Sequence, residues 1–139
     1  MKNQLLIPYL SLLFLVIGCE DKVISEPIAP ESGTISGSIT FEGTWPDSGS
    51  ILLTLDTQYP PMGPPAGSKT ITNGDLVNGI YDYSFASLAF GDYEAITVTY
   101  WPSGYSPGST DYSMLASNIS TISVSVDAPE LTINLDANF

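Results

Sequence analysis

The feature that most constrains the fold is an alternation of apolar and polar residues that begins near Gly33. Residues 34–41 read TISGSITF and place Ile35, Ile39 and Phe41 on one face, with serine and threonine on the other. Because successive side chains of a β-strand point to opposite faces, this period of two predicts half-buried antiparallel strands. The same alternation recurs in residues 51–55, 81–85, 96–100, 122–126 and 131–139.

These segments together predict the fold class. No stretch sustains helical spacing of apolar residues, except for the short segment 111–118, where Asp111 is placed to cap a single turn. Six or seven short strands within residues 33–139 predict an all-β domain, a small antiparallel β-sandwich of about seven strands. A domain of this size buries roughly 60–70% of its unfolded surface, so it is expected to fold without disulfides.

One expected strand has a fault in its alternation. Tyr93 and Ile96 are three residues apart, so they cannot both face inward on a regular strand. A β-bulge near residues 94 and 95 would bring both side chains to the inner face. The alternative is that Tyr93 faces outward at the start of the strand.

The N-terminal segment carries a targeting pattern. Lys2 precedes an apolar run at residues 5–17, which is shorter than the roughly 20 residues that span a bilayer and suits a secretory signal. The run ends in VIGC, residues 16–19, which resembles the lipobox of bacterial lipoproteins. The resemblance implies that Cys19 receives a diacylglyceryl group, that a peptidase cuts before it, and that the new amino terminus is acylated. An ordinary secretory signal with a chance cysteine is the alternative, although Cys19 is the only cysteine and no redox or metal motif follows it.

The lipobox gives a domain organisation and a location. Residues 1–18 are predicted to be a cleaved signal peptide, residues 19–32 the lipidated Cys19 and a flexible tether, and residues 33–139 the β-sandwich domain. Several acyl chains give stable anchoring, so the predicted location is the cell envelope. Glu20 and Asp21 resemble the surface-export signals of Bacteroidetes lipoproteins, which favours the outer membrane and display at the surface. A solvated linker without a sorting role is the alternative.

The charge balance excludes two classes of partner. The chain has a formal net charge of −12, with three lysines, no arginine and no histidine. Loss of Lys2 with the signal would leave two lysines against fifteen acidic residues, a balance of −13. Nucleic acid is excluded because phosphate binding needs a basic patch. Electrostatic attraction to anionic lipid headgroups is excluded for the same reason, so attachment to the membrane depends on the lipid at Cys19.

Two motifs in the predicted domain carry a second resemblance. Residues 33–39, GTISGSI, and residues 88–93, LAFGDY, resemble the opening strand and a later turn of carboxypeptidase regulatory-like domains, which are prealbumin-like β-sandwiches. Ala89 stands where that family usually has proline, and the strand after Tyr93 is one residue longer. The resemblance covers roughly residues 33–56 and 80–100. It implies an extracytoplasmic accessory or binding module without catalysis. Related starch-binding-like sandwiches bind glycans, but none of their site motifs occurs in this sequence.

Two long segments interrupt the strand pattern and are the candidate sites. Residues 57–68 contain four prolines, and residues 100–112 contain four aromatic residues among glycine, proline and serine. Loops on a rigid sandwich often carry function. Aromatic rings can stack on the apolar face of a sugar while a carboxylate or hydroxyl bonds its hydroxyl groups. The candidate ligand-binding residues are therefore Trp101, Tyr105, Asp111 and Tyr112, with Tyr59 as a helper.

A structural role is the alternative for the same aromatic residues. Tyr100 and Trp101 would then close the open end of the sandwich, while Tyr105 and Tyr112 pin the loop, since aromatic residues supply much of the core in a small domain. Trp45, in a compact turn, is expected to be a structural plug. The sequence does not say whether segments 57–68 and 101–112 lie at one end of the sandwich.

Catalytic and metal-binding residues are not singled out by the sequence. Without histidine, and without cysteine after residue 19, neither a Ser-His nor a Cys-His pair can be built in the domain. Ser68 and Lys69 are adjacent and lack the spacing of a Ser-x-x-Lys site. No stretch marks a particular pair of acids for glycoside hydrolysis. Oxygen ligands leave Ca²⁺ as the candidate metal, but no Asp-x-Asp-x-Asp-Gly loop exists. The sequence predicts no enzyme, no cofactor and no metal site.

Two functional hypotheses follow. The first is a non-catalytic, lipid-anchored envelope lipoprotein that acts as a structural or accessory binding module, in contact with an envelope protein. The second is a glycan-binding module that uses the aromatic loop, residues 101–112.

Overall fold

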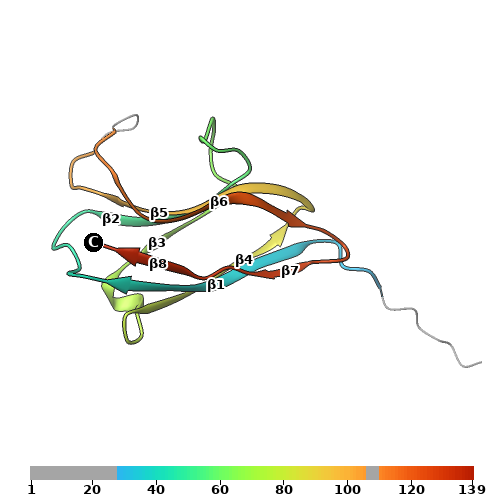
Figure 1. Ribbon diagram of the computed structural model, residues 1–139, viewed down its shortest axis with the longest axis horizontal. Coiled ribbons are helices and arrows are strands. Elements are labelled where there is room, and N and C mark those ends of the chain that lie inside the picture. The colour runs from blue at the N-terminus through green and yellow to red at the C-terminus, as the bar shows by residue number, and fades with distance from the viewer. Residues whose placement is uncertain (1–27, 106–109) are drawn as a thin grey trace, which may run out of the picture.

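A computed structural model of the chain describes residues 28–105 and 110–139 (Figure 1). Cys19, the predicted signal peptide 1–18 and most of the predicted tether 19–32 lie outside the described residues. The described residues form two facing β-sheets, which confirms the predicted all-β sandwich.

The strands divide evenly between the two sheets. In the first sheet β1 is central, with β4 on one side and both β7 and β8 on the other. The second sheet has the order β3-β2-β5-β6. The bounds are β1 Gly33–Glu42, β2 Ser50–Asp56, β3 Gly67–Ile71, β4 Ile80–Leu88, β5 Gly91–Trp101, β6 Ser113–Val124, β7 Glu130–Thr132 and β8 Leu135–Asn138.

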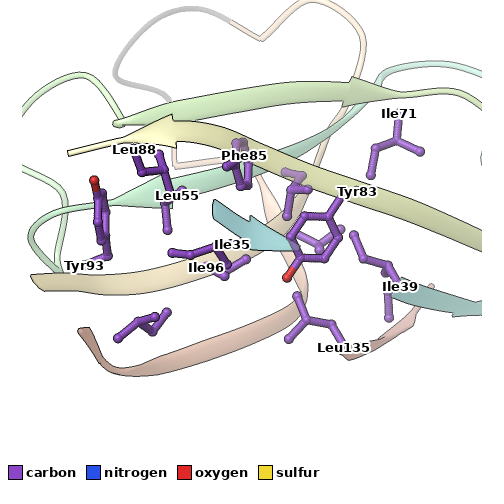
Figure 2. Packing of buried hydrophobic residues seen from close by; sticks show 14 of the residues in the cluster. Ile35, Ile39, Leu55, Ile71, Tyr83, Phe85, Leu88, Tyr93, Ile96 and Leu135 are labelled. Atoms are coloured by element: carbon purple, nitrogen blue, oxygen red, sulfur yellow. The ribbon is translucent and has the colours of Figure 1, made fainter. Parts of the chain in front are cut away.

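The core lies between the sheets and is made by the predicted apolar stripes. Ile35, Leu53 and Ile96, from three different strands, are each fully buried. Figure 2 shows side chains from both sheets meeting in this layer. Burial of apolar surface is the main stabilising contribution, at roughly 25 cal/mol per Å². The stripe on β2 therefore fixes which of its side chains face outward.

The last predicted strand differs from expectation. Residues 131–139 form two short strands, β7 and β8, and both pair with β1 in parallel rather than antiparallel orientation. Between them the ladder is interrupted, and the Asn134 side-chain oxygen accepts a hydrogen bond from the Ser38 backbone N–H at 2.9 Å. The Ile133 carbonyl lies against Gly37, where no Cβ would fit, and accepts a hydrogen bond from the Tyr83 hydroxyl at 2.7 Å. Alternation alone could not predict the direction, because parallel and antiparallel strands share a period of two.

An irregularity of the ladder lies where the bulge was predicted, near residues 94 and 95, but its extra residue is on the partner strand β6. The register between β5 and β6 shifts between Tyr93 and Ala95, and the Tyr93 and Ile96 side chains are both buried. At this bulge one residue of β5, Glu94, lies opposite two residues of β6, Ser120 and Thr121, so the extra residue belongs to β6, and Glu94 is exposed.

The helical turn expected at residues 111–118 is wrong, because β6 occupies most of this range. Its backbone pairs with β5 from Ser113 to Val124, and this long ladder outweighs the single hydrogen-bonded turn that Asp111 would have capped. The alternation expected to continue to Val126 ends at Val124, since the chain turns and Val126 is half exposed.

Two further features belong to the first sheet and its turns. Asn78 and Gly79 both have positive φ, at 54° and 79°, between the bridged residues Val77 and Ile80, which is the backbone conformation of a type I′ hairpin turn. Trp45 packs edge-on against Phe41 and Phe139, with ring centroids 5.3 Å and 5.2 Å away, so it plugs the sandwich as the structural alternative predicts. Within the described ranges no helix is long and apolar enough to cross a membrane.

Candidate functional site

The candidate site is a groove on the outer face of the β3-β2-β5-β6 sheet, with a volume of about 420 Å³. Its floor is formed by β2 and β5, whose core-facing residues point the other way. The proline-rich loop, residues 57–66, follows β2. Trp101 of the predicted aromatic segment is the last residue of β5, so the aromatic loop comprises residues 102–112. In Figure 1 the described parts of both loops rise from the same side of this sheet.

The register explains how the two loops come together. Asp56 pairs with Ala95 and Ser50 pairs with Trp101, so the loops leave opposite ends of the antiparallel β2–β5 pair. They do not share one end of the sandwich, but residues from both line the same groove. The groove is therefore a trough that runs along the sheet, with a loop at each end.

Trp101 is the centre of the aromatic wall. Its ring stacks on Tyr112, with centroids 4.9 Å apart and an interplanar angle of 28°, and packs against Tyr105 at 4.7 Å and 44°. Its indole Nε1 donates a hydrogen bond to Thr99 Oγ1 at 2.9 Å, which fixes the ring orientation. The rings pin one another, as the structural alternative expects, and Trp101 and Tyr112 also line the groove.

Tyr59 belongs to the opposite wall, together with residues of the proline-rich loop. Its backbone N–H donates a hydrogen bond to Glu94 Oε2 at 2.8 Å. Glu94 lies at the bulge between β5 and β6, so this irregularity of the ladder also positions the residue that holds the start of the loop. Proline restricts φ along the rest of the wall and limits its freedom to move.

The floor carries buried polar groups. Asp56, Thr97 and Thr99 are the buried polar residues among those the structure describes, and all three line the groove. Thr54 Oγ1 donates to Asp56 Oδ2 at 3.0 Å and lies 2.9 Å from Thr97 Oγ1. Since Thr54 has one hydroxyl proton and gives it to the carboxylate, Thr97 donates to Thr54. Burial raises the pKa of Asp56 above its ordinary value, and the Thr54 hydrogen bond partly opposes this shift.

The structure thus brings some of the predicted site residues together in one groove and leaves others outside it. Trp101, Tyr112 and Tyr59 line one groove, while Tyr105 supports Trp101 and is about half exposed. Asp111 is exposed and is not among the lining residues. The carboxylate that the groove does contain is Asp56, which sequence reasoning did not select.

Sequence reasoning missed the floor because its residues look like an ordinary solvent face. Thr54 and Asp56 alternate with buried leucines on β2, and Thr97 and Thr99 alternate with the buried Ile96 and Val98 on β5. Such polar stripes usually face water. The sequence does place these residues between two long loops. This position indicates a binding site only if both loops fold over the same face of the sheet.

The chemistry that the groove offers is binding chemistry: aromatic rings, hydroxyl groups and one carboxylate. Asp56 is the one acidic residue among the described lining residues. The described part of the chain contains no group of three or more histidine, cysteine, aspartate or glutamate side chains that could hold a metal ion.

Comparison with protein-family models, with curated proteins and with solved structures found no match to this chain. The lipobox and the carboxypeptidase regulatory-like motifs therefore stay predictions from the sequence.

Proposed function

We propose that this chain is a carbohydrate-binding module, held at the cell envelope by lipid on Cys19, and that the groove over β2 and β5 is its ligand site. The observation that carries the proposal is the stacked Trp101–Tyr112 pair beside the buried polar floor at Asp56 and Thr97. Ligand sites are typically concave, with apolar walls and a few convergent polar groups.

The two parts of the groove match the two parts of a sugar. A pyranose ring has an apolar face of C–H groups, which stacks on an aromatic ring, and a rim of hydroxyl groups, which need donors and acceptors. Trp101 and Tyr112 supply the ring surface. Asp56 supplies an acceptor, and Thr97 and Thr99 supply hydroxyl groups. Their burial strengthens such hydrogen bonds relative to those at an open surface.

The second candidate function is the structural or accessory module that docks an envelope protein. The observation that favours it is β6, which lies at the edge of its sheet and exposes Ile119 and Met114. An open strand edge can accept a strand from a partner. The groove favours the carbohydrate hypothesis because it combines ring surface with buried polar groups, which strand addition does not require.

The envelope location rests on the sequence. The lipobox at residues 16–19, the tether at 19–32 and the acidic pair Glu20 and Asp21 support a lipoprotein of the outer membrane that is displayed at the surface. The sandwich fold, with residues 33–39 in β1, supports the carboxypeptidase regulatory-like relationship. A Cys19→Ala variant expressed in a bacterium is expected to lose lipid labelling and membrane association. Unchanged processing and retention in the membrane fraction would contradict the anchor.

A glycan microarray tests the binding proposal with the full chain in detergent micelles. Trp101→Ala is expected to lose about 1–2 kcal/mol of binding free energy, or roughly five- to thirtyfold in affinity, because it removes the stacking surface. Tyr105→Ala, which removes a ring outside the lining, is the matched control and should lose less. Circular dichroism checks that each variant is folded. If the folded wild-type chain bound no glycan, the docking function would be favoured instead.

A further inference from the structure

We infer that the groove selects uncharged saccharides over chains of uronic acids, and that Asp56 is the residue that makes this selection. The inference rests on the proposed carbohydrate-binding function and names its substrate class.

The position of Asp56 puts it in the path of a bound chain. It is the last residue of β2 and is 6% exposed. It lines the groove and also an adjoining hollow of about 230 Å³ formed by the proline-rich loop around Gln58 and Met62. Because the two spaces share Asp56, a saccharide that extends from the groove into the hollow passes this carboxylate.

The hydrogen bonding of Asp56 leaves room for a donor from the ligand. Oδ2 accepts from Thr54 at 3.0 Å, whereas Oδ1 has no hydrogen bond to the residues that the structure describes. A carboxylate accepts about four hydrogen bonds and, when ionised, donates none. Sugar hydroxyl groups can donate to Oδ1. A uronate carboxylate is itself acceptor-only, so no proton would lie between the two groups.

The surroundings of Asp56 contain no charge that would compensate a second anion. No lysine or arginine occurs among the described residues that line the groove or the hollow. Lys69 is the one basic residue of the described ranges; its Nζ lies 5.6 Å from the Phe85 ring centroid, and its register partner Leu53 faces the core. Like charges in a partly desolvated site repel more strongly than in water. Burial also raises the pKa of Asp56, as expected where a negative charge is partly desolvated.

Matched oligosaccharides test the selection. Each pair consists of hexamers that differ only in the group at carbon 6, which is neutral in one member and a carboxylate in the other: β-1,4-mannan with β-1,4-mannuronan, β-1,4-glucan with β-1,4-glucuronan, and methyl-esterified with free galacturonan. Affinities are measured by calorimetry on the full chain in detergent micelles at neutral pH. The wild type is expected to bind an uncharged member at least about tenfold more tightly than its acidic partner.

Two isosteric variants distinguish the effect of the Asp56 charge on selectivity from the effect of the protein's net charge. Asp56→Asn removes the charge in the groove and should narrow the gap within a pair to about threefold or less. Asp82→Asn removes the same charge from β4 of the other sheet, where Asp82 is exposed, and should leave the gap unchanged.

The outcomes distinguish the inference from the function on which it rests. Equal affinity for both members of a pair, or a gap that Asp56→Asn leaves intact, would overturn the role of Asp56 while carbohydrate binding stands. A folded wild type that binds no uncharged member would overturn the proposed function and the inference with it.

Discussion

Asp56 is a residue whose environment works against stability. Its carboxylate is buried, its one hydrogen-bond donor among the described residues is Thr54, and desolvation raises its pKa. Buried charge without a compensating cation costs free energy. We predict that Asp56→Asn increases the free energy of unfolding at neutral pH by about 0.5–2 kcal/mol. Residues that weaken the fold in this way are typical of binding sites, where function requires a charged group in a partly desolvated groove.

The effect of Asp56 on stability should depend on pH. Its pKa is raised in the folded state, so the folded protein disfavours the ionised form relative to the unfolded chain. As the pH falls through this raised pKa, the wild-type carboxyl becomes neutral and the advantage of Asp56→Asn should shrink. Urea denaturation of both proteins across this pH range measures the difference. A variant less stable than wild type at neutral pH would mean that the Thr54 hydrogen bond outweighs desolvation.

Tyr83 predicts a change at the opposite end of the pH scale. Burial raises its pKa from 10.0 to about 12. Between these values the unfolded chain loses the phenolic proton while the folded chain keeps it, so stability falls as the pH rises. Tyr83→Phe should reduce this loss of stability at alkaline pH. At neutral pH it should cost about 1–3 kcal/mol, because the Ile133 carbonyl loses its hydroxyl donor. Denaturation of both proteins at neutral pH and at a pH between 10.0 and about 12 measures the two effects. If the stability of Tyr83→Phe fell with rising alkaline pH as steeply as that of the wild type, the loss would not come from Tyr83.

Among the individual residues of the groove, the aromatic ones could be predicted from the sequence and the polar ones could not. Trp101 and Tyr112 stand out because aromatic rings are unusual in loops of glycine, proline and serine. Asp56 and Thr97 occupy the positions of a strand that normally face water, so nothing local distinguishes them. Their role depends on which face the loops cover, and this is a property of the tertiary structure.

The bulge between β5 and β6 is an element that serves both the core and the groove. It lets Tyr93 and Ile96 face inward together, and it places Glu94 where its carboxylate accepts the Tyr59 N–H at 2.8 Å. We predict that Glu94→Ala frees the start of the proline-rich loop and weakens saccharide binding about fivefold. Its effect on stability should be small, since the hydrogen bond is exposed and exposed pairs contribute little.

An isosteric variant distinguishes positioning from charge at this site. Glu94→Gln keeps an acceptor oxygen for the Tyr59 N–H, so binding should remain near that of the wild type. Calorimetry with an uncharged hexasaccharide compares the two variants, and urea denaturation checks their stability. Equal loss in Glu94→Ala and Glu94→Gln would show that charge, and not the position of the loop, sets the affinity.

The alternation of apolar and polar residues predicted the strands that bury an apolar stripe. It missed strands that lack such a stripe and are stabilised by backbone pairing. The segments that became β1, β2, β4 and β5 were expected from their patterns. β3 was not, because its position facing the core is occupied by Lys69 opposite Leu53, a device that discourages pairing at a sheet edge. The first half of β6 also lacks alternation, and its ladder with β5 supplies the stabilisation.

The whole molecule has two different outer faces. The β3-β2-β5-β6 sheet carries the groove, whereas the outer face of the first sheet is acidic. Asp82, Glu130 and Asp136 are exposed there, because their register partners on β1 alternate with the buried Ile35 and Ile39. With a net charge of −12, repulsion among such acids disfavours the compact state.

Salt should therefore stabilise this protein. Raising the ionic strength from about 0.01 M to about 1 M shortens the Debye length from about 30 Å to about 3 Å, which screens repulsion between exposed acids. We predict a gain of about 1 kcal/mol, or roughly 4–8 °C in Tm, in sodium chloride. Neutralising the acidic face with Asp82→Asn, Glu130→Gln and Asp136→Asn should raise Tm at low salt and reduce the response to salt. If salt lowered Tm instead, attractive charge pairs would outweigh the repulsion across this face.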